Sequence, residues 1–275
     1  MRIFGIDFTS APRPAKPITV AAGALCDDAL RIEDVASIPD FEGFERTLRE
    51  PGPWVGGFDF PFGLPRELVA TLGWPLSWPG LVRHYASLDR AAIAAVFHAF
   101  RAARPAGSKY AHRESDAASR AHSPMKLVNP PVAWMLHAGA RRLLEAGVHI
   151  PALHDGDRSR VALEAYPGLA MRRIAARAGH GRAPSYKSDA RGRQTGARRD
   201  ARAKLLAAIA AGDYPWGVPV LMPRAVRDRA IEDSGGDTLD AIAAAAQAAW
   251  GAQRAGENFG LPDRVDRLEG WIVTA

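Results

Sequence analysis

Alternating apolar and polar residues predict β-strands in two parts of the chain. Residues 1–8 alternate toward a buried strand that ends in a short polar cluster, and residues 17–25 and 30–35 are two further strand candidates separated by an acidic turn. Residues 54–61 form an apolar run that a proline ends, and residues 159–165 return to strand character. The first three strands are close in sequence, so we expect them to form an antiparallel meander.

Apolar residues at helical spacing predict helices between and after these strands. A helix is expected over 41–49, with Asp40 at its N-cap, and residues 63–157 contain helices separated by Pro and Gly, at 90–103, 109–121 and 132–145. Later helices are predicted at 166–178, 197–211, 224–233 and 237–254, with a polar loop over 180–196 and a short terminal strand over 269–273. We expect one α/β domain over 1–275, with 63–157 as a helical insertion.

Composition excludes several classes of protein. Hydrophobic residues make up 47% and charged residues 24% of the chain, as in an ordinary globular protein. No apolar run approaches the roughly 20 residues that cross a bilayer. We therefore expect a cytoplasmic protein with no membrane partner. The single cysteine, Cys26, cannot form an internal disulfide or a cysteine-based zinc site, so any metal must be held by oxygen or histidine.

Positive charge is concentrated in one segment. Residues 172–204 contain eleven Lys or Arg residues and two acids, whereas the whole chain has a net charge of +6. Such a segment is typical of phosphate binding. The alternative is a solvated face, because most charge runs are solvated and the excess of Arg over Lys suggests a coding bias. The candidate phosphate-binding residues are Thr9, Ser10, Lys187, Arg198, Arg199 and Arg202.

Five acidic residues are candidates for catalysis. Asp7, Asp59 and Glu164 stand at predicted strand ends, and Asp237 and Asp240 lie one turn apart at the start of the last long helix. Neighbouring carboxylates raise one another's pKa, and a hard cation such as Mg²⁺ or Mn²⁺ removes that cost. The alternatives remain open: Asp237 can be a simple N-cap with Asp240 in the first turn, and Glu164 can pair with an arginine.

Arg113, Asp116 and Arg120 stand at helical neighbour spacing within the insertion. Opposite charges at this spacing are typical of a surface ladder, so we expect them to be exposed. The alternative is that the insertion gates a site.

Four segments together resemble a known family. They are residues 5–10, 57–65, 163–167 and 237–245, with the sequences Gly-Ile-Asp-Phe-Thr-Ser, Gly-Phe-Asp-Phe-Pro-Phe-Gly-Leu-Pro, Leu-Glu-Ala-Tyr-Pro and Asp-Thr-Leu-Asp-Ala-Ile-Ala-Ala-Ala. They resemble the family catalogued as domain of unknown function 429, which is described as predicted RNase H-like nucleases distantly similar to RuvC resolvases. The resemblance implies an RNase H-like fold, with a mixed five-stranded sheet flanked by helices.

The resemblance also implies positions for the acids. Asp7 would match the acid of the first strand and Asp59 that of the fourth, Glu164 would belong to the fifth strand, and Asp237 with Asp240 would be the paired acids of the final helix. RuvC-like enzymes usually carry Glu at the fourth-strand position, where this chain has the shorter Asp59. The helical insertion has no counterpart in minimal RNase H domains.

These observations favour a metal-dependent nuclease with Mg²⁺ or Mn²⁺ as cofactor and DNA or RNA as partner. Asp7 would bridge two metal ions, Asp59 would hold one, and Asp240 with Asp237 the other, as two-metal phosphodiester hydrolysis requires. One alternative is a nucleic-acid-binding protein of the same fold without turnover. Another is a phosphotransferase of the sugar kinase and actin superfamily, although 275 residues leave little room for the duplicated core of those proteins.

Overall fold

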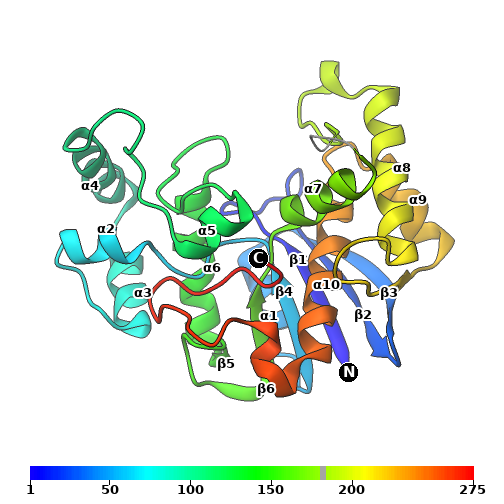
Figure 1. The fold of residues 1–275 in the computed structure, drawn as a ribbon, viewed down its shortest axis with the longest axis horizontal. Coiled ribbons are helices and arrows are strands. Elements are labelled where there is room, and N and C mark those ends of the chain that lie inside the picture. The colour runs from blue at the N-terminus through cyan, green and yellow to red at the C-terminus, as the bar shows by residue number, and fades with distance from the viewer. Residues whose placement is uncertain (180–183) are drawn as a thin grey trace.

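A mixed β-sheet forms the centre of the molecule. The computed structural model describes residues 1–179 and 184–275, so the predicted loop over 180–196 lies partly outside the described residues. The seven strands stand in the order β5-β6-β4-β1-β2-β3-β7 (Figure 1). They are β1 (Arg2–Asp7), β2 (Ile18–Cys26), β3 (Ala29–Ile38), β4 (Trp54–Phe58), β5 (Val148–His149), β6 (Asp157–Glu164) and β7 (Val220–Leu221).

The strand directions decide which ends meet. β1, β4 and β6 run parallel, whereas β2 pairs antiparallel with both β1 and β3. The predicted α/β class and meander are confirmed. The expected count of five strands differs from the seven observed, because β5 and β7 add two residues each at opposite edges, too few for an alternating pattern to reveal. The predicted terminal strand over 269–273 is reduced to one bridge between Glu164 and Ile272.

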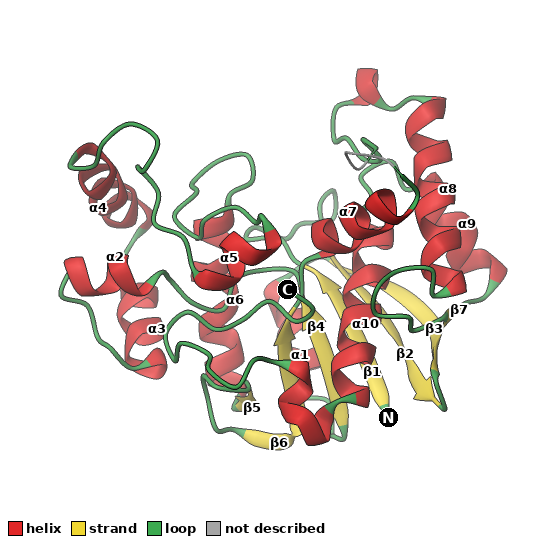
Figure 2. Ribbon diagram, viewed as in Figure 1, coloured by secondary structure: helices red, strands yellow, loops and turns green. Residues whose placement is uncertain are grey.

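Helices cover both faces of the sheet, as Figure 2 shows. Alternation along β1 sends Phe4 and Ile6 into one buried cluster and Ile3 into another. The first cluster includes residues of α1 (Phe41–Leu48) and α6 (Val132–Ala146), which therefore pack on one face. The second includes residues of α7 (Pro167–Arg177), α8 (Gly196–Ala211), α9 (Arg224–Glu232) and α10 (Asp237–Gln253).

Helix α10 lies unusually close to the sheet. Gly5 and Gly57 are paired across β1 and β4, and a Cβ at Gly5 would stand 2.0 Å from the carbonyl oxygen of Ala241. A Cβ at Gly57 would stand 2.3 Å from the carbonyl oxygen of Ala244. The alanine-rich face of α10 and the two glycines thus let backbone pack against backbone.

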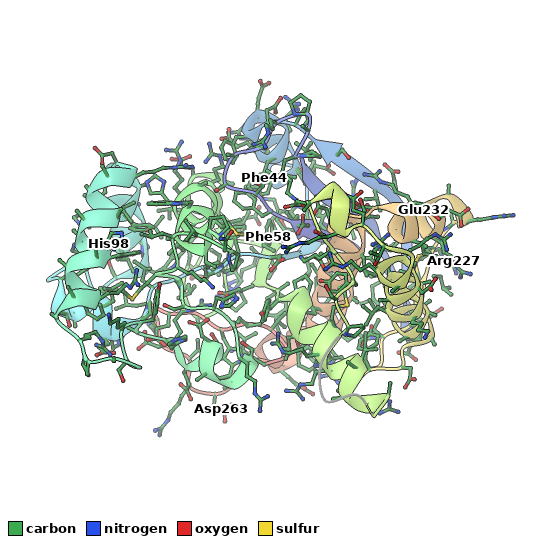
Figure 3. All side chains as sticks on the ribbon, turned by 90° about the horizontal axis from the view of Figure 1, so that it is seen from above. Phe44, Phe58, His98, Arg227, Glu232 and Asp263 are labelled. Atoms are coloured by element: carbon green, nitrogen blue, oxygen red, sulfur yellow. The ribbon has the colours of Figure 1, made fainter. Side chains whose placement is uncertain are left out.

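The segment 63–157 is mainly helical, as predicted, although it also contains the short strand β5. Its helices are α2 (Arg66–Thr71), α3 (Trp78–Ser87), α4 (Arg90–Ala102), α5 (Glu114–Ser119) and α6. The sequence pattern did not predict α2 and α3, which lie in a stretch interrupted by prolines, and it extended α5 too far in both directions. Figure 3 views the molecule from above and places His98 of α4 and Glu232 of α9 on opposite sides of Phe58, the last residue of β4.

Two short 3₁₀ helices, η1 (Arg191–Arg193) and η2 (Ala255–Gly260), complete the described elements. Within residues 1–179 and 184–275, no helix combines the length and the hydropathy that crossing a membrane requires.

Candidate functional site

Three acidic residues lie where parallel strands end at the same edge of the sheet. Asp7 is the last residue of β1, Glu164 is the last residue of β6, and Asp59 directly follows β4. The backbone N–H of Asp59 donates to the carbonyl of Ile6 at 2.9 Å, which fixes Asp59 beside the end of β1. The sheet therefore brings together three carboxyl groups from distant parts of the chain.

Helix α10 adds the other two acids to this edge. Gly5 faces Ala241 and Ala245 of α10, and Asp7, two residues farther along β1, faces the same side. The first turn of α10 contains Asp237 and Asp240. The close packing of α10 on β1 thus places its first turn next to Asp7.

The carboxyl groups affect one another's ionisation. Burial raises the pKa of Asp7 well above its ordinary value, and the charges of Asp237 and Asp240 raise it further. Burial and the charge of Asp240 raise the pKa of Asp59 to about 7. Among the described residues, no donor forms a hydrogen bond with the side chain of Asp7 or Asp59. These two carboxyl groups are therefore the unpartnered part of the cluster.

Asp240 and Asp237, by contrast, have partners. The Tyr186 hydroxyl donates to Asp240 Oδ1 at 2.6 Å, and the Lys187 ammonium pairs with Asp240 Oδ2. The Lys16 ammonium donates to both carboxylate oxygens of Asp237, at 3.0 and 3.1 Å. Two lysines thus neutralise the paired acids of α10.

Two of these partners, Lys16 and Tyr186, are not among the residues predicted from the sequence. Lys16 had a usable signal, because it lies in the loop between β1 and β2 and that loop leaves the sheet at the edge where Asp7 stands. Tyr186 had none, since its segment has no regular pattern.

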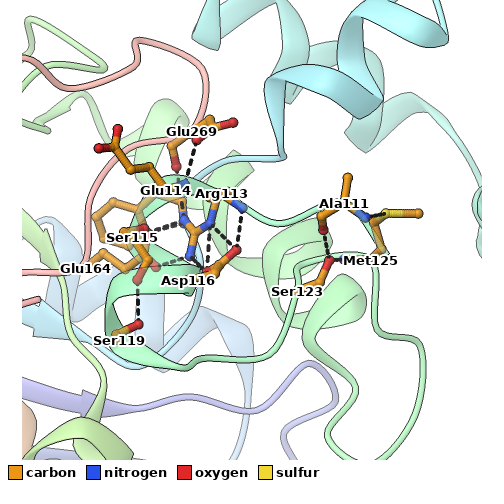
Figure 4. Close-up of polar contacts among 11 residues, drawn as sticks. Ala111, Arg113, Glu114, Ser115, Asp116, Ser119, Ser123, Met125, Glu164 and Glu269 are labelled. Carbon is orange, nitrogen blue, oxygen red and sulfur yellow. Dashed lines mark hydrogen bonds and ion pairs between the residues drawn. The ribbon is translucent and has the colours of Figure 1, made fainter. Parts of the chain in front are cut away.

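Glu164 is held in a buried ion-pair network (Figure 4). Arg113 donates to both oxygens of Glu164, at 2.6 and 2.8 Å, and to Asp116 at 2.7 Å. The backbone N–H of Phe62 also donates to Glu164, at 2.9 Å. Although burial alone would lower the pKa of Arg113, the charges of Glu164 and Asp116 raise it, so the guanidinium stays protonated. The expected surface ladder is wrong for Arg113 and Asp116, whose exposed fractions are 2% and 1%, whereas Arg120 is exposed as predicted. Glu164 takes the pairing role that was left open for it, and its arginine comes from the insertion rather than from the basic segment.

The basic segment contributes mostly support around Lys187. Arg198 donates to the carbonyl of Lys187 at 3.1 Å, and Arg202 donates to the carbonyl of Tyr186 at 2.8 Å. Arg202 is 4% exposed and Arg199 pairs with Glu232 on the surface. Of the predicted phosphate-binding residues in this segment, Lys187 and Arg198 lie nearest the carboxylates. Arg202 has a structural role, because it is buried and donates to backbone carbonyls.

The predicted hydroxyl residues follow Asp7 directly. Thr9 and Ser10 are partly buried, and the Thr9 hydroxyl oxygen accepts a hydrogen bond from the N–H of Ala11 at 3.5 Å. Both residues leave the sheet at the edge that carries the acids.

A cavity of about 350 Å³ opens beside the acids. Its lining includes Asp59, Asp240 and Lys187 from the site and Val132 and Met135 from α6. The helical insertion therefore forms part of the wall of the candidate site.

Comparison with known proteins places the chain in a family. The sequence model of a family described as "Protein of unknown function (DUF429)" matches residues 5–267, which include all five acids. The chain belongs to this family. No curated protein and no solved structure matches it. The resemblance to domain of unknown function 429 is thereby confirmed.

The donor atoms in this DUF429 protein suit a divalent cation in part. Asp7 and Asp59 offer carboxylate oxygens, the ligands that Mg²⁺ and Mn²⁺ prefer, and they lack protein donors among the described residues. Across residues 1–179 and 184–275, however, no three His, Cys, Asp or Glu side chains gather as a ready group of metal ligands. A cation at this edge would therefore compete with Lys187 for Asp240.

Proposed function

We propose that this DUF429 protein is a metal-dependent nuclease that hydrolyses phosphodiester bonds of DNA or RNA in the cytoplasm. The observation that carries the proposal is the convergence of Asp7, Asp59 and the first turn of α10 at one edge of the sheet. Burial and mutual repulsion raise the pKa of Asp7 and Asp59, so the unliganded site is poised to gain from a positive charge.

The strand order supports an RNase H-like fold for this site. The five longer strands stand in the order β3-β2-β1-β4-β6, with β2 antiparallel to its neighbours and β1, β4 and β6 parallel. This order and these directions support the mixed five-stranded sheet that the resemblance implies, to which β5 and β7 would be additions at the edges. The acids occupy the ends of the first, fourth and sixth strands and the start of the last long helix.

The acidic and basic side chains of the site have different proposed roles. Asp7, Asp59 and Asp240 would hold Mg²⁺ or Mn²⁺, which supplies an activated water and neutralises charge on the phosphate. Tyr186 holds Asp240 in a fixed orientation through its hydroxyl. Lys187, which pairs with Asp240 and lines the cavity, would bind a phosphate oxygen of the substrate. Asp237 pairs with Lys16, and its charge raises the pKa of Asp7.

Cleavage assays with Mg²⁺ or Mn²⁺ test this proposal directly. The Asp7→Asn variant should lose cleavage of labelled single-stranded and duplex DNA and RNA, because Asp7 lies between Asp59 and α10. Asp34→Asn, at an exposed position on β3, is the matched control and should cleave as the wild type does. Cleavage that persists unchanged in the Asp7→Asn variant would contradict the mechanism.

A second candidate is a nucleic-acid-binding protein without turnover. The pairing of Asp240 with Lys187 and of Asp237 with Lys16 favours it, since both acids are neutralised without metal. Calorimetric titration with Mn²⁺ separates the candidates. The nuclease predicts binding that Asp7→Asn and Asp59→Asn weaken, and the second candidate predicts nucleic-acid binding that neither Mn²⁺ nor these variants alter.

A further inference from the structure

The cavity beside the acids has walls of two kinds. The sheet edge and the segment at 186–187 supply Asp59, Asp240 and Lys187. The insertion supplies a mainly apolar wall that contains Ala121, Pro130, Val132 and Met135. The charged residues that the insertion contributes, Arg113 and Asp116, neutralise each other. A ligand that fills this space therefore meets apolar surface on one side and charge on the other.

The size of the cavity limits what can enter it. A volume of 350 Å³ corresponds to a sphere about 9 Å across, whereas the major groove of a DNA duplex alone is about 12 Å wide. Sites for small organic ligands begin at roughly 300 Å³. The cavity thus admits one small group and excludes a double helix.

Two ring side chains add to the apolar wall. Tyr166 is partly exposed, His122 is exposed, and both line the cavity. Burial lowers the pKa of His122, and the charges of Lys126 and Arg172 lower it further, so its imidazole is neutral at pH 7. Arg172 donates to the Tyr166 hydroxyl at 3.3 Å and lies over its ring at 5.1 Å, which braces Tyr166. Neutral rings on an apolar wall are the surface on which nucleobases pack.

Lys187 supplies the complementary charge for a phosphate. Its side chain is 46% exposed and lines the cavity, while its ammonium pairs with Asp240.

We infer that the cavity holds one unpaired nucleotide, with its base against the wall formed by the insertion and its phosphate toward Lys187 and the carboxylates. The inference rests on the proposed function and specifies its substrate: the nuclease acts on a nucleotide that is free of base pairing, at a strand end or in a single strand. The insertion is then the element that selects the substrate.

A variant that fills the cavity tests the inference. Ala121→Trp places a large side chain in the lining and leaves all five acids in the sequence, and Ala118→Trp is the matched control at an exposed position of α5 outside the lining. The probes are each common nucleoside 5′-monophosphate, measured by calorimetry, and a short labelled single strand and its duplex, measured by fluorescence anisotropy. All are measured in EDTA, so that binding is separated from cleavage.

Wild-type protein and Ala118→Trp should bind the single strand more tightly than the blunt duplex, and Ala121→Trp should weaken single-strand binding about tenfold or more, the scale of losing one base–aromatic contact. If the protein binds monophosphates as well as the strand, the ligand of the cavity can be a free nucleotide. If it binds the strand alone, the ligand is a nucleotide within a nucleic-acid strand. If Ala121→Trp does not fold by circular dichroism, Met135→Trp replaces it at a second lining position.

The outcomes separate this inference from the proposed function. If Ala121→Trp weakens nucleotide binding and no cleavage occurs in Mg²⁺ or Mn²⁺, the inference of a nucleotide site is supported and the proposed nuclease activity is contradicted. If Asp7→Asn abolishes cleavage and Ala121→Trp leaves binding unchanged, the proposed nuclease activity is supported and the inference of a nucleotide site in the cavity is contradicted. Equal binding of single strand and duplex by all variants also overturns the cavity.

Discussion

At the residue scale, the position of Asp7 follows from strand alternation. Ile6 and Phe8 are buried on one side of the sheet, and Asp7 therefore shares the opposite side with Gly5, where α10 packs. A single register thus decides both that α10 can approach and that the carboxyl faces its first turn. The sequence pattern alone was enough to predict the strand and the acid at its end, because both depend on neighbours in sequence.

The raised pKa of Asp59 predicts how the stability of the metal-free protein depends on pH. Its pKa is raised from 3.8 to about 7 in the folded state, so between about pH 4 and pH 7 the folded state binds more protons than the unfolded state. Stability attributable to this group falls as the pH rises through that window, by up to about 4 kcal/mol at about 1.36 kcal/mol per pKa unit. The variant Asp59→Asn, which cannot ionise, should therefore melt above the wild type at pH 8.

Thermal melting in EDTA from pH 4 to pH 8 measures this difference. The melting temperature of Asp59→Asn relative to the wild type should rise from pH 4 to pH 7 and then level off. A difference that stays constant with pH would show that burial and the charge of Asp240 do not raise the pKa of Asp59. Adding Mn²⁺ at pH 8 should reduce the advantage of the variant, since the cation offsets the repulsion in the wild type.

At the element scale, two contacts fix the site: α10 against the sheet and the insertion against β6. The first depends on Gly57, where a Cβ would stand 2.3 Å from the carbonyl oxygen of Ala244. Gly57→Ala should push α10 outward, cost about 1–3 kcal/mol as overpacking does, and move Asp240 away from Asp7. Urea denaturation and cleavage rate measure the two effects. Gly256→Ala, where a Cβ meets open space, should change neither, and unchanged behaviour of Gly57→Ala would contradict the close packing.

The second contact depends on Arg113. Arg113→Met leaves the carboxylates of Glu164 and Asp116 buried without their partner, which should cost about 3–5 kcal/mol of unfolding free energy. The matched control is Arg46→Met, which breaks an exposed pair with Glu42 and should cost less than about 1 kcal/mol. Similar losses from both variants in urea denaturation would show that the insertion is not anchored through this network.

The network explains why sequence reasoning placed Arg113 on the surface. Spacing of opposite charges along a helix is the same for an exposed ladder and for a buried pair, and only the partner 51 residues away in sequence, Glu164, distinguishes them. The long helices and strands with strong periodicity were predicted to within a few residues. Elements of two residues and partners drawn from loops, such as β7 and Tyr186, depend on tertiary contacts that no local pattern encodes.

At the scale of the whole molecule, the positive segment meets the acidic edge at Lys187, which pairs with Asp240. Arg198 donates a hydrogen bond to the backbone carbonyl of Lys187, and the ammonium of Lys187 pairs with Asp240. Figure 3, by contrast, places Arg227 of α9 at the periphery. Each phosphate contact contributes about 0.7 to the slope of log affinity against log salt for single strands. If Arg198 contacts a phosphate, Arg198→Gln should lower that slope by about 0.7.

Anisotropy titrations with a labelled single strand over a range of salt concentrations measure this slope. Arg227→Gln removes the same charge from an exposed position and should leave the slope near the wild-type value, because Arg227 lies away from the acids. Arg199→Gln should fall between the two, since Glu232 already neutralises Arg199. Equal reductions of the slope in all three variants would mean that the strand responds only to the net charge of the protein. That result would contradict a specific contact between Arg198 and a phosphate.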